Sequence, residues 1–197
     1  MLAAAIVAGA GISFAFAQEG YRVESVTAAP AGVAESISKS LDSQGARLIG
    51  GDGKTIAEVW LRKEIPLTVA TGGYQGLAEG TLVGVLSFPE GGADFRGQTI
   101  AAGTYTLRYE HIPQDGNHLG AAPEPNFLLL CPASEDRDLD ATFTFETLVE
   151  LSRDATKTNH PGPLMLQPVE SGNAPGVQRN DLGHVALVDR ERRREHD

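Results

Sequence analysis

The sequence predicts an all-β protein, a single-domain β-sandwich of jelly-roll or immunoglobulin-like type with one or two short helices. Glycine (23 residues) and proline (11 residues) are scattered evenly along the 197 residues, and the apolar runs between them are short. Many short strands separated by turn residues are typical of sandwiches and barrels. Since no linker, internal repeat or low-complexity block interrupts this pattern, residues 18–190 are expected to form one domain.

The clearest predicted strand covers residues 104–109. Tyr105, Leu107 and Tyr109 fall on one face and polar residues on the other, because side chains alternate across a strand. This period of two predicts a half-buried strand, with its tyrosines packed in the core rather than exposed as a platform for sugar rings. The preceding residues 95–100 are expected to form its hairpin partner.

A second hairpin is predicted at Asp52-Gly53, because Asp-Gly supplies the positive φ angles of a tight turn. This turn would join strands at residues 46–50 and 54–62. Further strands are expected, in chain order, at residues 21–28, 65–70, 81–88, 126–132, 163–169 and 183–190. The third and fourth of these are apolar on both faces, which is typical of central strands.

Two short helices are predicted. Small or apolar side chains at the i, i+3, i+4 and i+7 spacing of an amphipathic helix occur at Phe145, Leu148, Val149 and Ser152. Thr144 is a suitable N-cap for this helix. A weaker pattern predicts a second helix at residues 33–41, and residues 170–182 are expected to form a polar loop.

Composition excludes several functional classes. The formal net charge is −10, and an acidic surface repels phosphate backbones, so no nucleic-acid partner is expected. Cys131 is the single cysteine, which rules out an intramolecular disulfide, and its apolar neighbours predict a buried, unreactive thiol. The sequence has no G-x-S-x-G or H-E-x-x-H motif, no phosphate-binding glycine loop and no cysteine pair for zinc, so no catalytic residue is predicted.

The first seventeen residues, MLAAAIVAGAGISFAFA, contain no charged side chain and end in Ala15-Phe16-Ala17. An apolar stretch closed by small residues at −3 and −1 is typical of a secretory signal peptide. A membrane anchor is disfavoured, because about 20 apolar residues are needed to span a bilayer. We therefore expect cleavage near Ala17, a periplasmic or extracellular mature chain without a transmembrane segment, and a disordered charged tail at residues 191–197.

The densest polar constellation is HIPQDGNH, residues 111–118. Imidazole and carboxylate groups are the ligands of divalent transition metals, so His111, Asp115 and His118 form a candidate metal site. His160, from a distant loop, joins Asp115 and His118 as a candidate ligand-binding set. The competing interpretation is structural, because Pro, Asp, Gly and Asn in this stretch favour a turn by their own backbone preferences.

Asp136, Asp138 and Asp140 alternate in the manner of the first carboxylates of a calcium loop. Ala141 stands where such a loop has glycine, and Thr147 stands where it has a bidentate glutamate. The sequence therefore predicts a solvated acidic loop before a helix, with a weak structural calcium site as the alternative, and no cofactor beyond a divalent metal.

Residues 97–107, GQTIAAGTYTL, resemble the G-K-x-I-P-A-G-x-Y-x-L segment of secreted bacterial all-β proteins of unknown function. The stretches QDGNHLG, NFLLL, NHP and AEVW look similar to those of a subgroup, although Ala101 stands where the pattern prefers proline. The resemblance implies a β-sandwich exported to the periplasm or beyond. It implies no activity, cofactor or catalytic residue.

The sequence thus favours an exported β-sandwich of unknown activity, a non-enzymatic binding or envelope-associated module. Its expected partner is a small molecule, a glycan or an envelope protein. One alternative is a metal-binding protein or metal-dependent enzyme that uses the cluster from His111 to His118. Another is a subunit of an extracellular assembly formed by pairing of edge strands.

Overall fold

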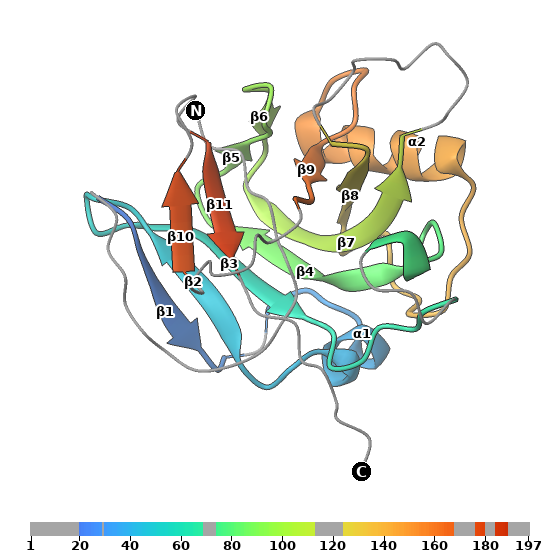
Figure 1. Cartoon of the computed structure of the whole chain (residues 1–197), viewed down its shortest axis with the longest axis horizontal. Coiled ribbons are helices and arrows are strands. Elements are labelled where there is room, and N and C mark those ends of the chain that lie inside the picture. The colour runs from blue at the N-terminus through green and yellow to red at the C-terminus, as the bar shows by residue number, and fades with distance from the viewer. Residues whose placement is uncertain are drawn as a thin grey trace.

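The computed structural model describes residues 20–28, 30–68, 74–112, 124–167, 176–179 and 184–188. In this part of the chain, seven strands form an antiparallel sheet in the order β1-β2-β3-β4-β7-β8-β9 (Figure 1). These strands are β1 (Arg22–Val26), β2 (Gly45–Ile49), β3 (Thr55–Leu61), β4 (Leu82–Phe88), β7 (Gly103–His111), β8 (Asn126–Pro132) and β9 (Pro163–Met165). The remaining elements are the pairs β5 (Gly92–Ala93) with β6 (Thr99–Ile100) and β10 (Gly176–Arg179) with β11 (Val185–Val188), the helices α1 (Glu35–Ser40) and α2 (Phe145–Thr156), and the 3-10 turn η1 (Tyr74–Gly76).

The predicted all-β fold, a single domain with short helices, is confirmed. The hairpin of β10 and β11 packs over one face of the large sheet, where Leu48, Val177 and Val185 form a buried cluster, so the fold is sandwich-like (Figure 1). Neighbouring strands of the large sheet follow one another along the chain, apart from the β5–β6 insertion. This sequential order differs from the Greek-key order of jelly rolls and immunoglobulin domains.

One face of the large sheet, here called the inner face, carries the main core. The side chains of Tyr105, Leu107 and Tyr109 point to this face and are buried, packed with Leu128 and Leu130 of β8. Their burial confirms that these tyrosines belong to the core. The central positions predicted for β4 and β8 also agree with their burial: only Ser87 of β4 is partly exposed, and the middle residues of β8 from Leu128 to Cys131 are buried.

The opposite, outer face is covered by the two helices. Ile37 and Leu41 of the α1 region pack on Trp60 and its neighbours, and Leu148 of α2 packs on β8. The prediction of a half-buried strand at 104–109 is therefore wrong, because both faces of β7 are buried. Its outward-facing residues are Thr106, Arg108 and Glu110.

The predicted hairpin between residues 95–100 and the following strand is also wrong. β6 pairs with β5, while β7 lies between β4 and β8. The reason is local: Asp94 accepts hydrogen bonds from the backbone N–H groups of Arg96 and Gln98, at 2.9 Å each. These bonds close a turn that directs β6 back along β5.

Two smaller predictions also differ from the structure. Residues 65–68 form no strand, because the N–H and hydroxyl of Thr68 both bond to the carbonyl of Gly76 and hold this segment as a loop; residues 69 and 70 lie outside the described residues. The predicted loop 170–182 contains strand β10, since Val177 is buried against Leu48.

Helix α2 begins where the sequence predicts. The Thr144 hydroxyl accepts a hydrogen bond from the N–H of Thr147 at 3.3 Å, which satisfies one of the unpaired donors of the first turn. The helix continues to Thr156, four residues past the predicted pattern, and ends at Lys157 in the left-handed conformation with φ 56°.

Gly84 gives the first testable prediction, because it lies directly against the backbone of β3. A Cβ atom at this position would lie 2.4 Å from the carbonyl oxygen of Trp60, and backbone cannot move aside as a flexible side chain can. We expect Gly84→Ala to lower the free energy of unfolding by about 2–4 kcal/mol. Chemical denaturation measures the change.

Gly53 provides the matched control. It has a positive φ of 81° but no atom within 4 Å of its would-be Cβ, so Gly53→Ala introduces only backbone strain of about 1–2 kcal/mol. Equal losses in the two variants would contradict the close approach at Gly84.

Candidate functional site

Charged side chains are buried on the outer face of the sheet, between the apolar clusters under α1 and α2. Arg108 and Glu110 are neighbours on this face of β7, and each is 1% exposed. Asp136, which is 2% exposed, comes from the segment that joins β8 to α2. Strongly perturbed, buried ionisable groups mark candidate functional sites, but they also occur in structural networks. The contacts of each group decide between these two interpretations.

Arg108 and Asp136 form a bidentate ion pair. The Nε and Nη2 atoms of Arg108 donate to the two carboxylate oxygens of Asp136, at 2.7 Å each. Two further donations from the guanidinium reach the backbone carbonyls of Gly80 and Asp138, and the ring of Phe143 lies 5.0 Å from the guanidinium carbon. The charge is therefore fully engaged in holding segments together, which favours a structural role.

This ion pair corrects the prediction of a solvated acidic loop at Asp136. Asp138 and Asp140 are exposed as predicted, but Asp136 turns inward to Arg108 and also accepts a hydrogen bond from the hydroxyl of Thr106. The partner on β7 lies 28 residues earlier in the chain, so local spacing gives no signal for it.

Glu110 differs from Arg108, because neither of its carboxylate oxygens has a hydrogen-bond partner. It pairs across the sheet with Phe127, which packs in the apolar cluster beneath α2. The pKa of Glu110 is raised from 4.5 to about 7; burial is the largest cause of this increase and the negative charge of Glu79 is the next. The backbone N–H groups of His111 and Gly80 lie nearby without hydrogen-bond geometry to the carboxylate; they oppose this shift, and Glu146 adds to it. A carboxyl group that titrates near neutral pH is suited to proton transfer, but this one is closed off from solvent.

Of the predicted site histidines, the structure describes His111 and His160, and these two lie apart. His111 ends β7, whereas the loop of His160 joins the sheet where the N–H of Leu130 donates to the carbonyl of Gly162. Leu130 pairs with Leu107, four residues before His111, and four residues along a strand span about 13 Å. Among the described residues, no three His, Cys, Asp or Glu side chains are placed to hold a metal ion.

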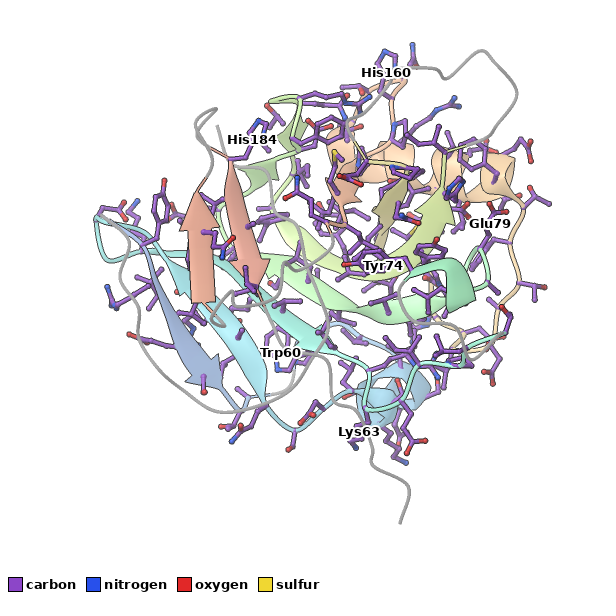
Figure 2. The ribbon with its side chains drawn as sticks, viewed as in Figure 1. Trp60, Lys63, Tyr74, Glu79, His160 and His184 are labelled. Carbon is purple, nitrogen blue, oxygen red and sulfur yellow. The ribbon has the colours of Figure 1, made fainter. Side chains whose placement is uncertain are left out.

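Asp115 and His118 lie outside the described residues, so the metal and ligand sets that contain them stay predictions. The imidazole of His160 is exposed and points away from the molecule (Figure 2). Its backbone carbonyl accepts hydrogen bonds from the hydroxyls of Thr156 and Thr158. In the structure, His160 therefore stabilises a turn through its backbone carbonyl.

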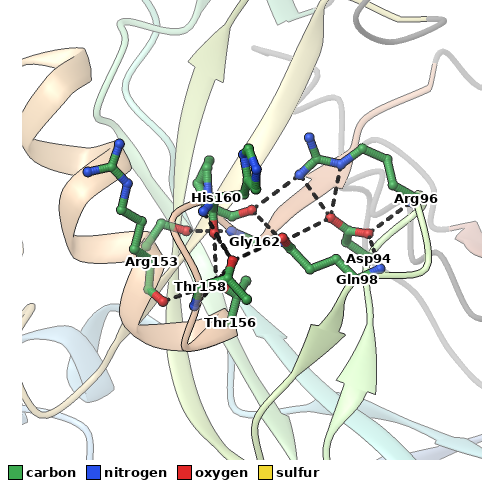
Figure 3. A network of polar contacts seen from close by, with 10 residues as sticks. Asp94, Arg96, Gln98, Arg153, Thr156, Thr158, His160 and Gly162 are labelled. Atoms are coloured by element: carbon green, nitrogen blue, oxygen red, sulfur yellow. Dashed lines mark hydrogen bonds and ion pairs between the residues drawn. The ribbon is translucent and has the colours of Figure 1, made fainter.

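The His160 turn belongs to a polar network that sequence reasoning missed (Figure 3). Asp94, fully buried, receives hydrogen bonds from the side chain of Arg96, and both Arg96 and Gln98 also donate to the carbonyl of Pro161. These bonds clamp the β5–β6 hairpin to the loop between α2 and β9. No motif indicates this contact, because its two sides are more than sixty residues apart.

Cys131 is buried, as predicted, in the apolar cluster beneath α2. Burial raises the pKa of its thiol strongly, and the carboxylate of Asp136 raises it further. Because the thiolate is the nucleophilic form, this cysteine is unsuited to catalysis.

A surface pocket of about 330 Å³ lies at one end of the large sheet. It is bordered by Tyr21, by the β2–β3 turn and by the turn that follows β4. Lys54 and Glu90 form an ion pair of 3.2 Å at this pocket. Unlike the buried charges, these groups face solvent, so the pocket is a region of the described structure that a ligand can enter.

Comparisons with protein-family models, with curated proteins and with solved structures find no match to this chain. The resemblance of residues 97–107 therefore stays a prediction. No helix within the described residues has the length and apolar character needed to cross a membrane.

The ion pair gives a second prediction. Asp136→Asn leaves the Arg108 charge buried without its counter-charge, so we expect the free energy of unfolding to fall by about 3–5 kcal/mol. The double variant Arg108→Met, Asp136→Leu removes both charges and should be more stable than Asp136→Asn. Urea denaturation of the three proteins measures the difference, and unchanged stability of Asp136→Asn would contradict a structural ion pair.

Glu110 gives a third prediction, which concerns pH. Since its pKa is raised from 4.5 to about 7 on folding, its favourable contribution is complete below pH 4.5 and is lost as the pH rises through about 7. The neutral side chain of Glu110→Gln removes this loss. Each pKa unit corresponds to about 1.4 kcal/mol, and solvent screening of the exposed Glu79 reduces its share of the shift. We therefore expect the free energy of unfolding of Glu110→Gln to rise by about 1–3 kcal/mol relative to wild type between pH 5 and pH 8.

Urea denaturation of both proteins at the two pH values measures this gain. Glu35→Gln is the control, because Glu35 is exposed and pairs with Lys39 on the surface of α1. Parallel pH profiles for wild type and Glu110→Gln would show that Glu110 is ionised throughout.

Proposed function

We propose that this chain is an exported, sandwich-like binding module of the cell envelope that acts without catalysis. The observation that carries the proposal is that the charged groups of the protein differ in their access to solvent. The buried ones hold segments of the fold together, or are closed off from solvent, whereas the charges around the pocket remain accessible. A rigid sheet with an open pocket at its turns is suited to binding.

Export is supported by the sequence at the N-terminus. Residues 1–17 are apolar and end in the small-residue pattern of Ala15 and Ala17. They lie outside the described residues. The fold described for the rest of the chain contains no disulfide, since Cys131 is free, and its stability rests on packing and buried polar contacts.

Assembly through edge strands receives less support than binding. The edge strand β1 carries Arg22 and Glu24, which form an exposed ion pair of 2.9 Å. The other edge, β9, has three residues and begins with Pro163. Charged side chains, proline and short length are features that oppose pairing with another sheet.

The fourth prediction tests export. The full chain, produced in a Gram-negative bacterium, should be recovered outside the cytoplasm with Gln18 as its first residue. Mass spectrometry of the intact protein after fractionation measures both properties. Ala17→Phe is the control, because signal peptidase requires a small residue at −1 and the uncleaved precursor should accumulate. Recovery of a chain that begins at Met1 in the cytoplasm would overturn the proposal.

A further inference from the structure

The surface pocket has walls that are fixed by backbone contacts. In the β2–β3 turn, the N–H of Gly53 donates to the carbonyl of Gly50, and the N–H of Lys54 donates to the carboxylate of Asp52. On the opposite wall, a Cβ at Gly91 would lie 2.8 Å from the carbonyl oxygen of Ile100, so the main chain packs there without space for a side chain. Preformed walls of this kind lower the ordering cost of binding.

Tyr21 and Ile56 supply the apolar part of the pocket. Both side chains line it, and both also pack against the buried cluster of Leu48, Val177 and Val185. The aromatic ring of Tyr21 is therefore supported from behind by the sandwich-like second layer. An aromatic ring held in this way provides a flat, partly exposed surface with a polar hydroxyl at its end.

Charged and hydroxyl groups form the remainder of the lining. Lys54 and Glu90 neutralise each other at 3.2 Å, and Asp52 leaves an excess of one negative charge. An anionic ligand would therefore be repelled. A ligand with several neutral hydroxyl groups would find carboxylate acceptors, an ammonium donor and the hydroxyl of Thr55 around one aromatic face.

We propose that this pocket binds one ring of a neutral saccharide, with the ring on Tyr21 and its hydroxyls bonded by Glu90 and Lys54. The volume of about 330 Å³ is near the lower limit of ligand pockets, about 300 Å³, which suits a single ring. This inference rests on the proposed function of the chain as a binding module and names the ligand class of its site.

The fifth prediction tests this inference by NMR titration of the purified protein. The probes are methyl glucoside and N-acetylglucosamine, with methyl glucuronoside as the anionic analogue and the dipeptide Ala-Ala as a zwitterion of similar size. We expect a neutral sugar to shift resonances of Tyr21 and Ile56 with a dissociation constant of about 1 mM, a weak affinity typical of a small, solvated ligand. The glucuronoside should bind at least several-fold more weakly, because of the negative excess.

Variants identify the contacts. Tyr21→Ala should weaken sugar binding about tenfold, while Tyr21→Phe keeps the ring and should change it by less than about threefold. Glu90→Gln should also weaken binding. Its matched control, Glu35→Gln, removes another exposed carboxylate, which pairs with Lys39 away from the pocket, and should have no effect. Melting curves verify that each variant is folded.

Several results would overturn the inference: no shift with either neutral sugar, equal binding of the glucuronoside, binding of the dipeptide alone, or unchanged affinity in Tyr21→Ala. These failures are distinguishable from failure of the proposed function. A protein that is exported and cleaved before Gln18 but ignores neutral sugars contradicts only the saccharide site. A protein that binds sugar but stays in the cytoplasm contradicts export.

Discussion

The Arg108–Asp136 ion pair is the interaction on which the outer half of the structure depends. A buried guanidinium requires partners for its donors, and here those partners come from the segment after β8 and from Gly80 before β4. Meeting this requirement fixes the path of residues 133–144 across the sheet. Helix α2 begins at the end of that path, where Thr144 caps it, and so it lies over Leu129 and Cys131. One charge pair thus positions the apolar layer that buries it.

Glu110 shows that burial by itself does not determine how a charge is accommodated. It lies two residues from Arg108 on the same strand and face, yet its neighbours are the apolar Phe127 and the like charges of Glu79 and Glu146. Arg108 is surrounded by a counter-charge and by backbone carbonyls that accept its hydrogen bonds. Glu110 is accommodated by a raised pKa, which makes its neutral form accessible near pH 7. The stability of this face therefore depends on protons as well as on packing.

The features predicted from sequence are those determined by local chemistry. The alternation in β7 predicts which of its residues form the inner core, Thr144 predicts the start of α2, and the apolar neighbours of Cys131 predict its burial. The cover over the outer face depends on contacts between segments far apart in the chain, such as Asp136 with Arg108. The candidate site also depends on contacts between distant segments, since its pocket is formed by Tyr21 together with two separate turns. Local sequence patterns do not predict such long-range contacts.

The segment GQTIAAGTYTL acts in the structure as a folding motif. Ile100 is fully buried, Gly97 has a positive φ of 80°, and the hydroxyl of Tyr105 donates to the carbonyl of Ala101. The departure from the resembled pattern at Ala101 also has a physical reason. Its N–H donates to the carbonyl of Ala155 at 2.8 Å and ties this segment to the end of α2, a bond that proline lacks the hydrogen to make. Because each of these contacts serves the architecture, a resemblance in this segment carries information about the fold rather than about an activity.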